Sequence, residues 1–90
     1  MEQKYRNLVN EIIQQVRPHA QVINAEETAI GDNWQVILHL TKSDFSLKIE
    51  FILKPEDLKH RHRICDWRDF IVINFQDLRR QHLESTRSLV

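Results

Sequence analysis

The chain contains very few of the residues that interrupt or cross-link a fold: one glycine, two prolines and one cysteine in 90 residues. A single cysteine cannot form a disulfide within the chain. Scarce glycine and proline argue against long flexible linkers and low-complexity segments. No apolar run, including residues 70–73, approaches the roughly 20 residues that a membrane-spanning helix needs. These absences predict a protein without internal disulfides, linkers or a membrane span.

The remaining composition is that of a folded domain. Hydrophobic residues make up 41% of the chain, which also has seven aromatic side chains, so enough apolar surface is available to offset the entropy lost on ordering. Ninety residues suit one core, and we predict a single domain over residues 1–90 with a frayed tail from about residue 86. Residues 1–15 are amphipathic and do not resemble a signal peptide, so a cytoplasmic location is expected.

Charge is balanced overall but uneven along the chain. The formal net charge is zero, yet residues 1–57 carry six Lys/Arg against nine Asp/Glu, and residues 58–90 carry seven against four. Proteins that bind nucleic acid usually have an excess of positive charge, because neutralising phosphates drives their affinity. The balance therefore disfavours nucleic acid as the principal partner.

The first half of the chain predicts a helix followed by strands. Apolar residues recur at helical spacing over about residues 2–17, and Pro18 ends that helix. Residues 21–30 are compatible with a strand, and turn residues at 31–33 lead into a clearly alternating strand at 34–41. A second turn at 42–44 precedes another alternating strand at 45–53. Neighbouring strands joined by short turns predict an antiparallel meander.

The second half is harder to interpret. Pro55 and the two acids after it suit the start of a short helix. Residues 70–75 fit a helical stripe with Trp67 and Leu78, but that reading leaves Val72 and Ile73 off the buried face, so we predict a covered strand. A last helix from Asn74 or Asp77 to about residue 85 would turn Leu78 and His82, with Leu89 beyond it, inward. The predicted fold class is α+β: an N-terminal helix, a meander of three strands, or four with 70–75, and a C-terminal helix.

The segment LKHRHRICDW, residues 58–67, has the densest chemistry. In a helix, four residues would share one stripe as zinc ligands: His62, Cys65, Asp66 and Asp69. That stripe leaves out His60, and the rest of the sequence offers no second pair of ligands. The neighbouring arginines would also repel a cation. Cys65 lacks glycine-permitted oxyanion donors nearby, and a lone cysteine is more often a small buried hydrophobe. Alternating charges near Lys48 and Glu50 fit a solvent-facing strand better than a nuclease site. We therefore predict no metal, no cofactor and no catalytic residue.

What remains is contact chemistry. Arginine forks and an aromatic edge are frequent anchors for acidic protein surfaces and for phosphates. The alternative is a solvated basic connection with Trp67 in the core. The candidate partner-binding residues of this predicted basic surface are Lys59, His60, Arg61, His62, Arg63, Trp67, Arg68, Arg79 and Arg80.

Two classes of function fit these residues. The first is a small non-enzymatic binding or regulatory protein of the inhibitor, antitoxin, immunity or assembly-factor type, which contacts a protein partner with an acidic surface. The alternative is a nucleic-acid-binding module that uses the basic surface at 59–80. A sheet of so few strands also leaves an edge unpaired, so either a homodimer or pairing with a partner along a sheet edge is expected, with no membrane contact.

Overall fold

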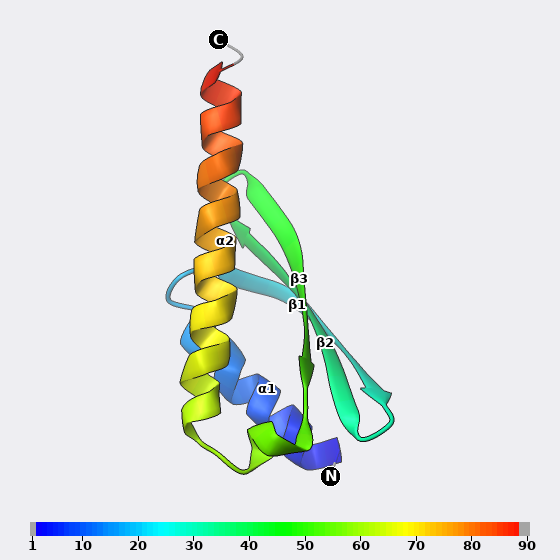
Figure 1. The fold of residues 1–90 in the computed structure, drawn as a ribbon. Helices are drawn as coiled ribbons and strands as arrows, with labels where there is room; N and C mark the ends of the chain where they lie inside the picture. Colours follow the sequence, from blue (N-terminus) through cyan, green and yellow to red (C-terminus); the bar gives the residue numbers. More distant parts are fainter. Residues whose placement is uncertain (1, 89–90) are drawn as a thin grey trace.

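The computed structural model describes residues 2–88 and contains two long helices and one three-stranded sheet (Figure 1). Helix α1 spans Glu2–Val16 and is followed by strands β1 (Gln21–Ile30), β2 (Asn33–Lys42) and β3 (Phe45–Leu53). A short 3₁₀ helix, η1 (Pro55–Leu58), leads into helix α2 (His62–Ser88). This order confirms the predicted α+β class.

The sheet is an antiparallel meander in the order β1-β2-β3, so β2 is paired on both sides. Opposite residues include Ala29 and Trp34 in the first hairpin, and Leu38 and Ile49 in the second. The register of β1 shifts between Val22 and Asn24, which is a bulge near the start of that strand. The alternation predicted for β2 and β3 is confirmed, since their buried residues lie on one face.

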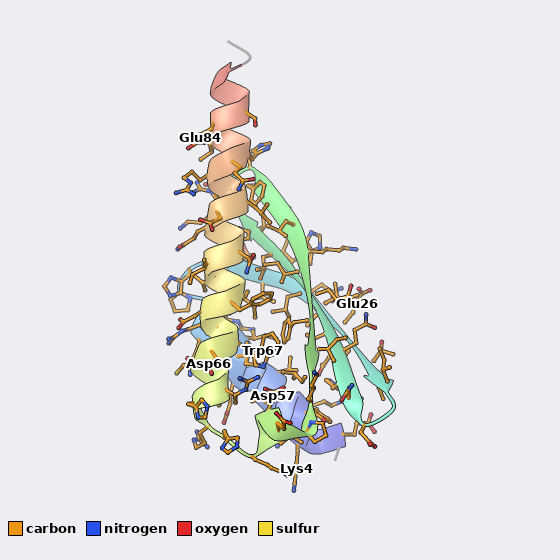
Figure 2. The ribbon with its side chains drawn as sticks, viewed as in Figure 1. Lys4, Glu26, Asp57, Asp66, Trp67 and Glu84 are labelled. Atoms are coloured by element: carbon orange, nitrogen blue, oxygen red, sulfur yellow. The ribbon has the colours of Figure 1, made fainter. Side chains whose placement is uncertain are left out.

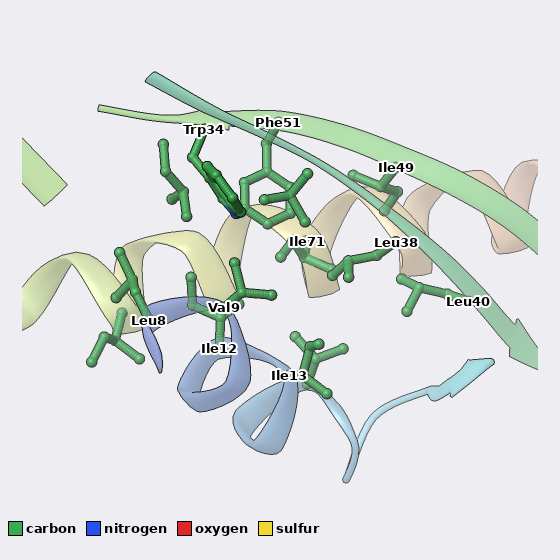
Figure 3. Close-up of a cluster of buried hydrophobic side chains, with 14 of the residues drawn as sticks. Leu8, Val9, Ile12, Ile13, Trp34, Leu38, Leu40, Ile49, Phe51 and Ile71 are labelled. Atoms are coloured by element: carbon green, nitrogen blue, oxygen red, sulfur yellow. The ribbon is translucent and has the colours of Figure 1, made fainter. Parts of the chain in front are cut away.

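Both helices cover the same face of the sheet and enclose the core (Figures 1 and 3). The inner residues of β2 are almost completely buried, with Val36, Leu38 and Leu40 at 0% exposure. Burying a leucine contributes both transfer and packing energy, so changing either leucine to alanine would lower the free energy of unfolding by about 2–5 kcal/mol. The helical contribution to the core comes from α1 residues Tyr5, Leu8, Val9, Ile12, Ile13 and Val16, and from α2 residues Ile64, Ile71 and Phe75.

The prediction of a fourth strand at 70–75 is wrong, because these residues lie within the continuous helix α2. Ile71 and Phe75 are buried, but Phe70 is 43% and Ile73 is 56% exposed. The segment 70–75 therefore carries apolar side chains on every side of the helix, but only some of them are buried. The prediction of a separate last helix starting at Asn74 or Asp77 is wrong for the same reason, because helix α2 is continuous through Ser88. Fraying of the tail from about residue 86 stays a prediction. Residues 89 and 90 lie outside the described part.

The predicted inward placement of Leu78 and His82 is wrong, because both side chains are exposed. The ring of His82 nevertheless contacts the ring of Phe45, at a centroid separation of 5.3 Å. Leu89, the third residue predicted to face inward, lies outside the described residues. Within residues 2–88, neither helix combines the length and apolar character needed to cross a bilayer.

Candidate partner-binding site

The connection between β3 and α2 is organised by a buried carboxylate, that of Asp57, which is only 3% exposed. Its Oδ2 accepts a hydrogen bond from the backbone N–H of Lys54 at 2.7 Å, which closes the start of η1. Its Oδ1 accepts from Arg63 Nε at 2.7 Å and from Trp67 Nε1 at 3.2 Å. Asp57 therefore joins the end of β3, the 3₁₀ helix and the first turns of α2 (Figure 2).

Two members of the predicted basic surface are engaged by this carboxylate. The hydrogen bond from Arg63 to Asp57, together with the charge of Asp57, raises the pKa of Arg63 above its ordinary value. Trp67 is half-buried and stacks on Phe51, with ring centroids 4.9 Å apart. Both side chains help to hold the connection in place, and Trp67 packs against the core while remaining partly exposed.

Arg68 is also engaged within the chain. Its Nη1 donates to Gln15 Oε1 of α1 at 3.1 Å, and its Nη2 lies 3.0 Å from Asp69 Oδ1. The hydrogen bond between Arg68 and Gln15 joins α2 to α1.

In the connection itself, four members of the predicted basic surface are exposed: Lys59, His60, Arg61 and His62. The two imidazole rings are neighbours, with centroids 5.4 Å apart. His62 Nε2 also lies 4.0 Å from Asp66 Oδ2, one turn further along α2. We call these four residues the basic connection.

Arg79 and Arg80 do not belong to the same surface. They lie 17 and 18 residues beyond His62 in one continuous helix, which corresponds to about 25 Å along its axis. Arg80 is paired with Asp77 at 3.4 Å, and Arg79 is half-buried beside the β2–β3 turn. The predicted basic surface is thus divided between the basic connection and a separate place on α2.

The basic connection borders a hollow of about 200 Å³ between α1 and the start of α2. We call it the first hollow. Buried Leu8 and Ile64, with half-buried Leu58, form an apolar base. Its polar rim is formed by Lys4, Asn7, Glu11, His60 and Arg61. Lys4 and Arg61 carry positive charge against the single rim carboxylate of Glu11, and the buried charge of Asp57 is already paired with Arg63. The first hollow therefore combines an apolar base with a rim of net positive charge.

Three other kinds of site were considered for these residues: a reactive cysteine, a metal site and a charged cluster on β3. Cys65 is exposed, so its prediction as a buried hydrophobe is wrong, and its Sγ lies 4.0 Å from Gln15 Oε1. Among residues 2–88, no three His, Cys, Asp or Glu side chains gather closely enough to hold a metal ion. The charged side chains of Lys48 and Glu50 lie exposed on β3, facing away from the helices.

Sequence reasoning missed the residues that α1 brings to this site. Lys4, Leu8 and Glu11 are more than 45 positions from the basic connection, and nothing in their local pattern indicates that they meet it. Asp57 was noted only as an acid favourable at a helix N-terminus. An acid three residues after Lys54 in a Pro-initiated turn is a signal for capping, but its arginine and tryptophan partners depend on how α2 folds back.

Comparison with protein-family models, with curated proteins and with solved structures gives no significant match to this chain. The site must therefore be interpreted from its own geometry and charge.

Proposed function

We propose that this chain is a small binding protein without catalytic activity, which recognises an acidic segment of a partner protein at the first hollow. The function is of the inhibitor, antitoxin, immunity or assembly-factor type, in which covering a partner's surface is the activity. The observation that carries the proposal is the pairing of an apolar base with a cationic rim on a connection fixed by Asp57.

The proposed contact has two parts. An aliphatic side chain of the partner enters the first hollow, whose volume of about 200 Å³ suits one such anchor, and packs on Leu8 and Ile64. Carboxylates beside that anchor meet Lys4 and Arg61, which give orientation and fast association. The rigid connection supports this role because a preformed site loses less conformational entropy when a partner binds.

The experiment is an affinity purification of the tagged chain from its native cells, followed by identification of the retained proteins. Three versions are compared: the unchanged chain, Lys4→Glu with Arg61→Glu, and the matched control Lys48→Glu with Arg80→Glu. The control makes the same change of charge at exposed positions away from the first hollow. We expect one partner to be retained by the unchanged chain and the control, and to be lost from the first-hollow variant.

The same purification tests the alternative function, a nucleic-acid-binding module. The exposed basic connection favours that alternative, and the net charge of zero disfavours it. Nuclease treatment before elution should leave the protein partner in place. Loss of all bound material on nuclease treatment, or identical partners for all three versions, would contradict the proposed function.

A further inference from the structure

A second hollow lies at the other end of α1, between the turn that follows this helix and the turn that joins β2 to β3. Its volume is about 610 Å³, within the range of roughly 300–1,000 Å³ typical of small-molecule sites. One wall is formed by residues 17–22 and the other by residues 41–43. It shares no residue with the first hollow, so the inference below does not rest on the proposed function.

The charge of the second hollow has one sign. Arg17 and Lys42 carry this positive charge, His19 lies beside them, and the lining includes no aspartate or glutamate. None of these three side chains forms an ion pair with another residue in the part of the chain that the structure describes. In a chain with a net charge of zero, unpaired cations gathered around one hollow are a local excess that an anion would neutralise.

Neutral donors accompany these cations. The hydroxyl of Ser43 and the side-chain amide of Gln21 line the second hollow, and neither is used in a hydrogen bond within residues 2–88. Pro18, Ala20 and Val22 add an apolar wall. The hollow thus offers fixed positive charge, spare donors and a patch that can cover a small apolar group.

Both walls are held by hydrogen bonds. The backbone N–H groups of His19 and Ala20 donate to the carbonyl of Val16 at 2.9 and 3.2 Å, which fixes the turn after α1. On the other wall, Thr41 Oγ1 donates to the carbonyl of Phe45 at 3.1 Å and accepts from Ser46 Oγ at 3.0 Å. The cations therefore project from anchored backbone, which reduces the entropy lost when a ligand binds.

We propose that the second hollow binds a small phosphorylated molecule, with its phosphate between Arg17 and Lys42 and its carbon skeleton against Pro18 and Val22. Phosphate suits these residues because the guanidinium presents a planar fork of donors and the ammonium adds a compact charge. The hydroxyl of Ser43 supplies a neutral donor to a remaining oxygen. The volume exceeds that of one phosphate group, so an organic phosphate fills the hollow better than the inorganic ion.

The experiment titrates the full chain, at low ionic strength, with phenyl phosphate, inorganic phosphate and sulfate. Binding is measured by calorimetry and mapped by amide chemical shifts. We expect phenyl phosphate to bind more tightly than the two inorganic anions and to shift the amides of residues 19–22 and 41–43. Arg17→Ala with Lys42→Ala should weaken binding at least tenfold. The matched control, Arg6→Ala with Lys48→Ala, removes the same charge elsewhere and should change affinity less than twofold.

Three results would overturn the proposal. The first is the absence of phenyl phosphate binding to a folded chain, with the fold confirmed by the dispersion of its amide signals. The second is equal weakening by both double variants, since that would reflect overall charge alone. The third is a single-stranded oligonucleotide that binds through Arg17 and Lys42 with steep salt dependence while phenyl phosphate does not, which would identify a nucleic-acid contact instead.

Discussion

At the scale of single residues, Asp57 organises the connection between β3 and α2. Among residues 2–88 it is the one charged residue that is buried. Its carboxylate accepts three hydrogen bonds, from the backbone N–H of Lys54, from Arg63 and from Trp67. A buried carboxylate costs free energy unless its oxygens are satisfied, and here they are. The shape of the basic connection therefore depends on a residue that is not itself available to a partner.

We predict that Asp57→Ala lowers the free energy of unfolding by about 2–4 kcal/mol, because the N–H of Lys54 and the indole N–H of Trp67 lose their buried acceptor. Urea denaturation followed by tryptophan fluorescence measures this change. The control is Asp66→Ala, which removes an exposed carboxylate 3.7 Å from the same arginine and should change stability by less than about 0.5 kcal/mol. Equal effects of the two substitutions would contradict the role assigned to Asp57.

Tyr5 supports a prediction about alkaline pH. Burial, and then the charges of Asp57 and Asp32, raise the pKa of Tyr5 above its ordinary value of 10.0. The unfolded chain therefore releases the phenol proton first, so the free energy of unfolding falls as the pH rises from about 10 toward the folded pKa. Below about pH 10 the contribution of Tyr5 is complete and does not vary.

Absorbance can test this directly, because Tyr5 is the only tyrosine in the chain. We expect its phenolate to appear at a higher pH in the folded protein than in denaturant. The variant Tyr5→Phe should lose about 1 kcal/mol at neutral pH, since the hydroxyl donates to the carbonyl of Asp32 at 2.7 Å. It should also lose less stability than the unchanged chain between pH 9 and 11. The same alkaline loss in both proteins would disprove the assignment.

At the scale of helices and strands, the sequence predicted helix α1, strands β2 and β3 and both turns, because each carries a clear periodicity or turn residues. It indicated β1 only as compatible with a strand, since that segment alternates weakly. The prediction was wrong within helix α2, where the apolar residues at 70–75 do not follow one helical face. The apolar run at 70–75 predicts a strand covered on both sides, whereas Ile73 is 56% exposed. A run of apolar residues cannot reveal by itself which members will be covered, since that depends on elements distant in sequence. The rim residues of α1 in the first hollow were missed for the same reason.

The two hairpin turns support a reciprocal prediction. Gly31 and Ser43 each occupy the first position of a two-residue turn, with φ of 59° and 55°. Glycine adopts this left-handed conformation without strain, whereas serine does not. We expect Ser43→Gly to raise the free energy of unfolding by about 0.5 kcal/mol and Gly31→Ser to lower it by about 1 kcal/mol.

Thermal and urea denaturation of both variants measure the two shifts. A Cβ at Gly31 would meet no atom within 4 Å, so steric contact does not complicate the comparison. Changes of the same sign in both variants would show that something other than backbone conformation controls these turns.

At the scale of the whole molecule, the fold is elongated, with extents of 51 × 22 × 17 Å. The two hollows lie near opposite ends of α1, and Lys4 and Arg17 are separated by about 20 Å along the helix axis. A partner protein at the first hollow and a phosphorylated ligand at the second could therefore be bound together. The sheet has two edge strands, β1 and β3, and the edge of β1 is a third accessible feature.

We predict that the chain forms dimers at high concentration by pairing β1 edges, because a ten-residue strand leaves its outward N–H and C=O groups unpaired. Sedimentation velocity over a wide concentration range measures this association. Ile23→Lys places a charge on β1, where the isoleucine is 53% exposed, and should restore monomers. Ile52→Lys makes the same change on β3 and should leave the dimer intact. A monomer at millimolar concentration, or equal effects of the two lysines, would contradict edge pairing.

The meander order of the strands has a consequence for how the chain folds. Each strand pairs with its neighbour in sequence across a two-residue turn, so closing either hairpin costs little loop entropy. The packing of α1 on α2 instead joins residues far apart, such as Gln15 and Arg68, which are 53 positions apart. We therefore expect the transition state to contain the sheet around β2, with α1 docking afterwards. Val36→Ala should then mainly slow folding, whereas Ile12→Val should mainly accelerate unfolding in stopped-flow measurements.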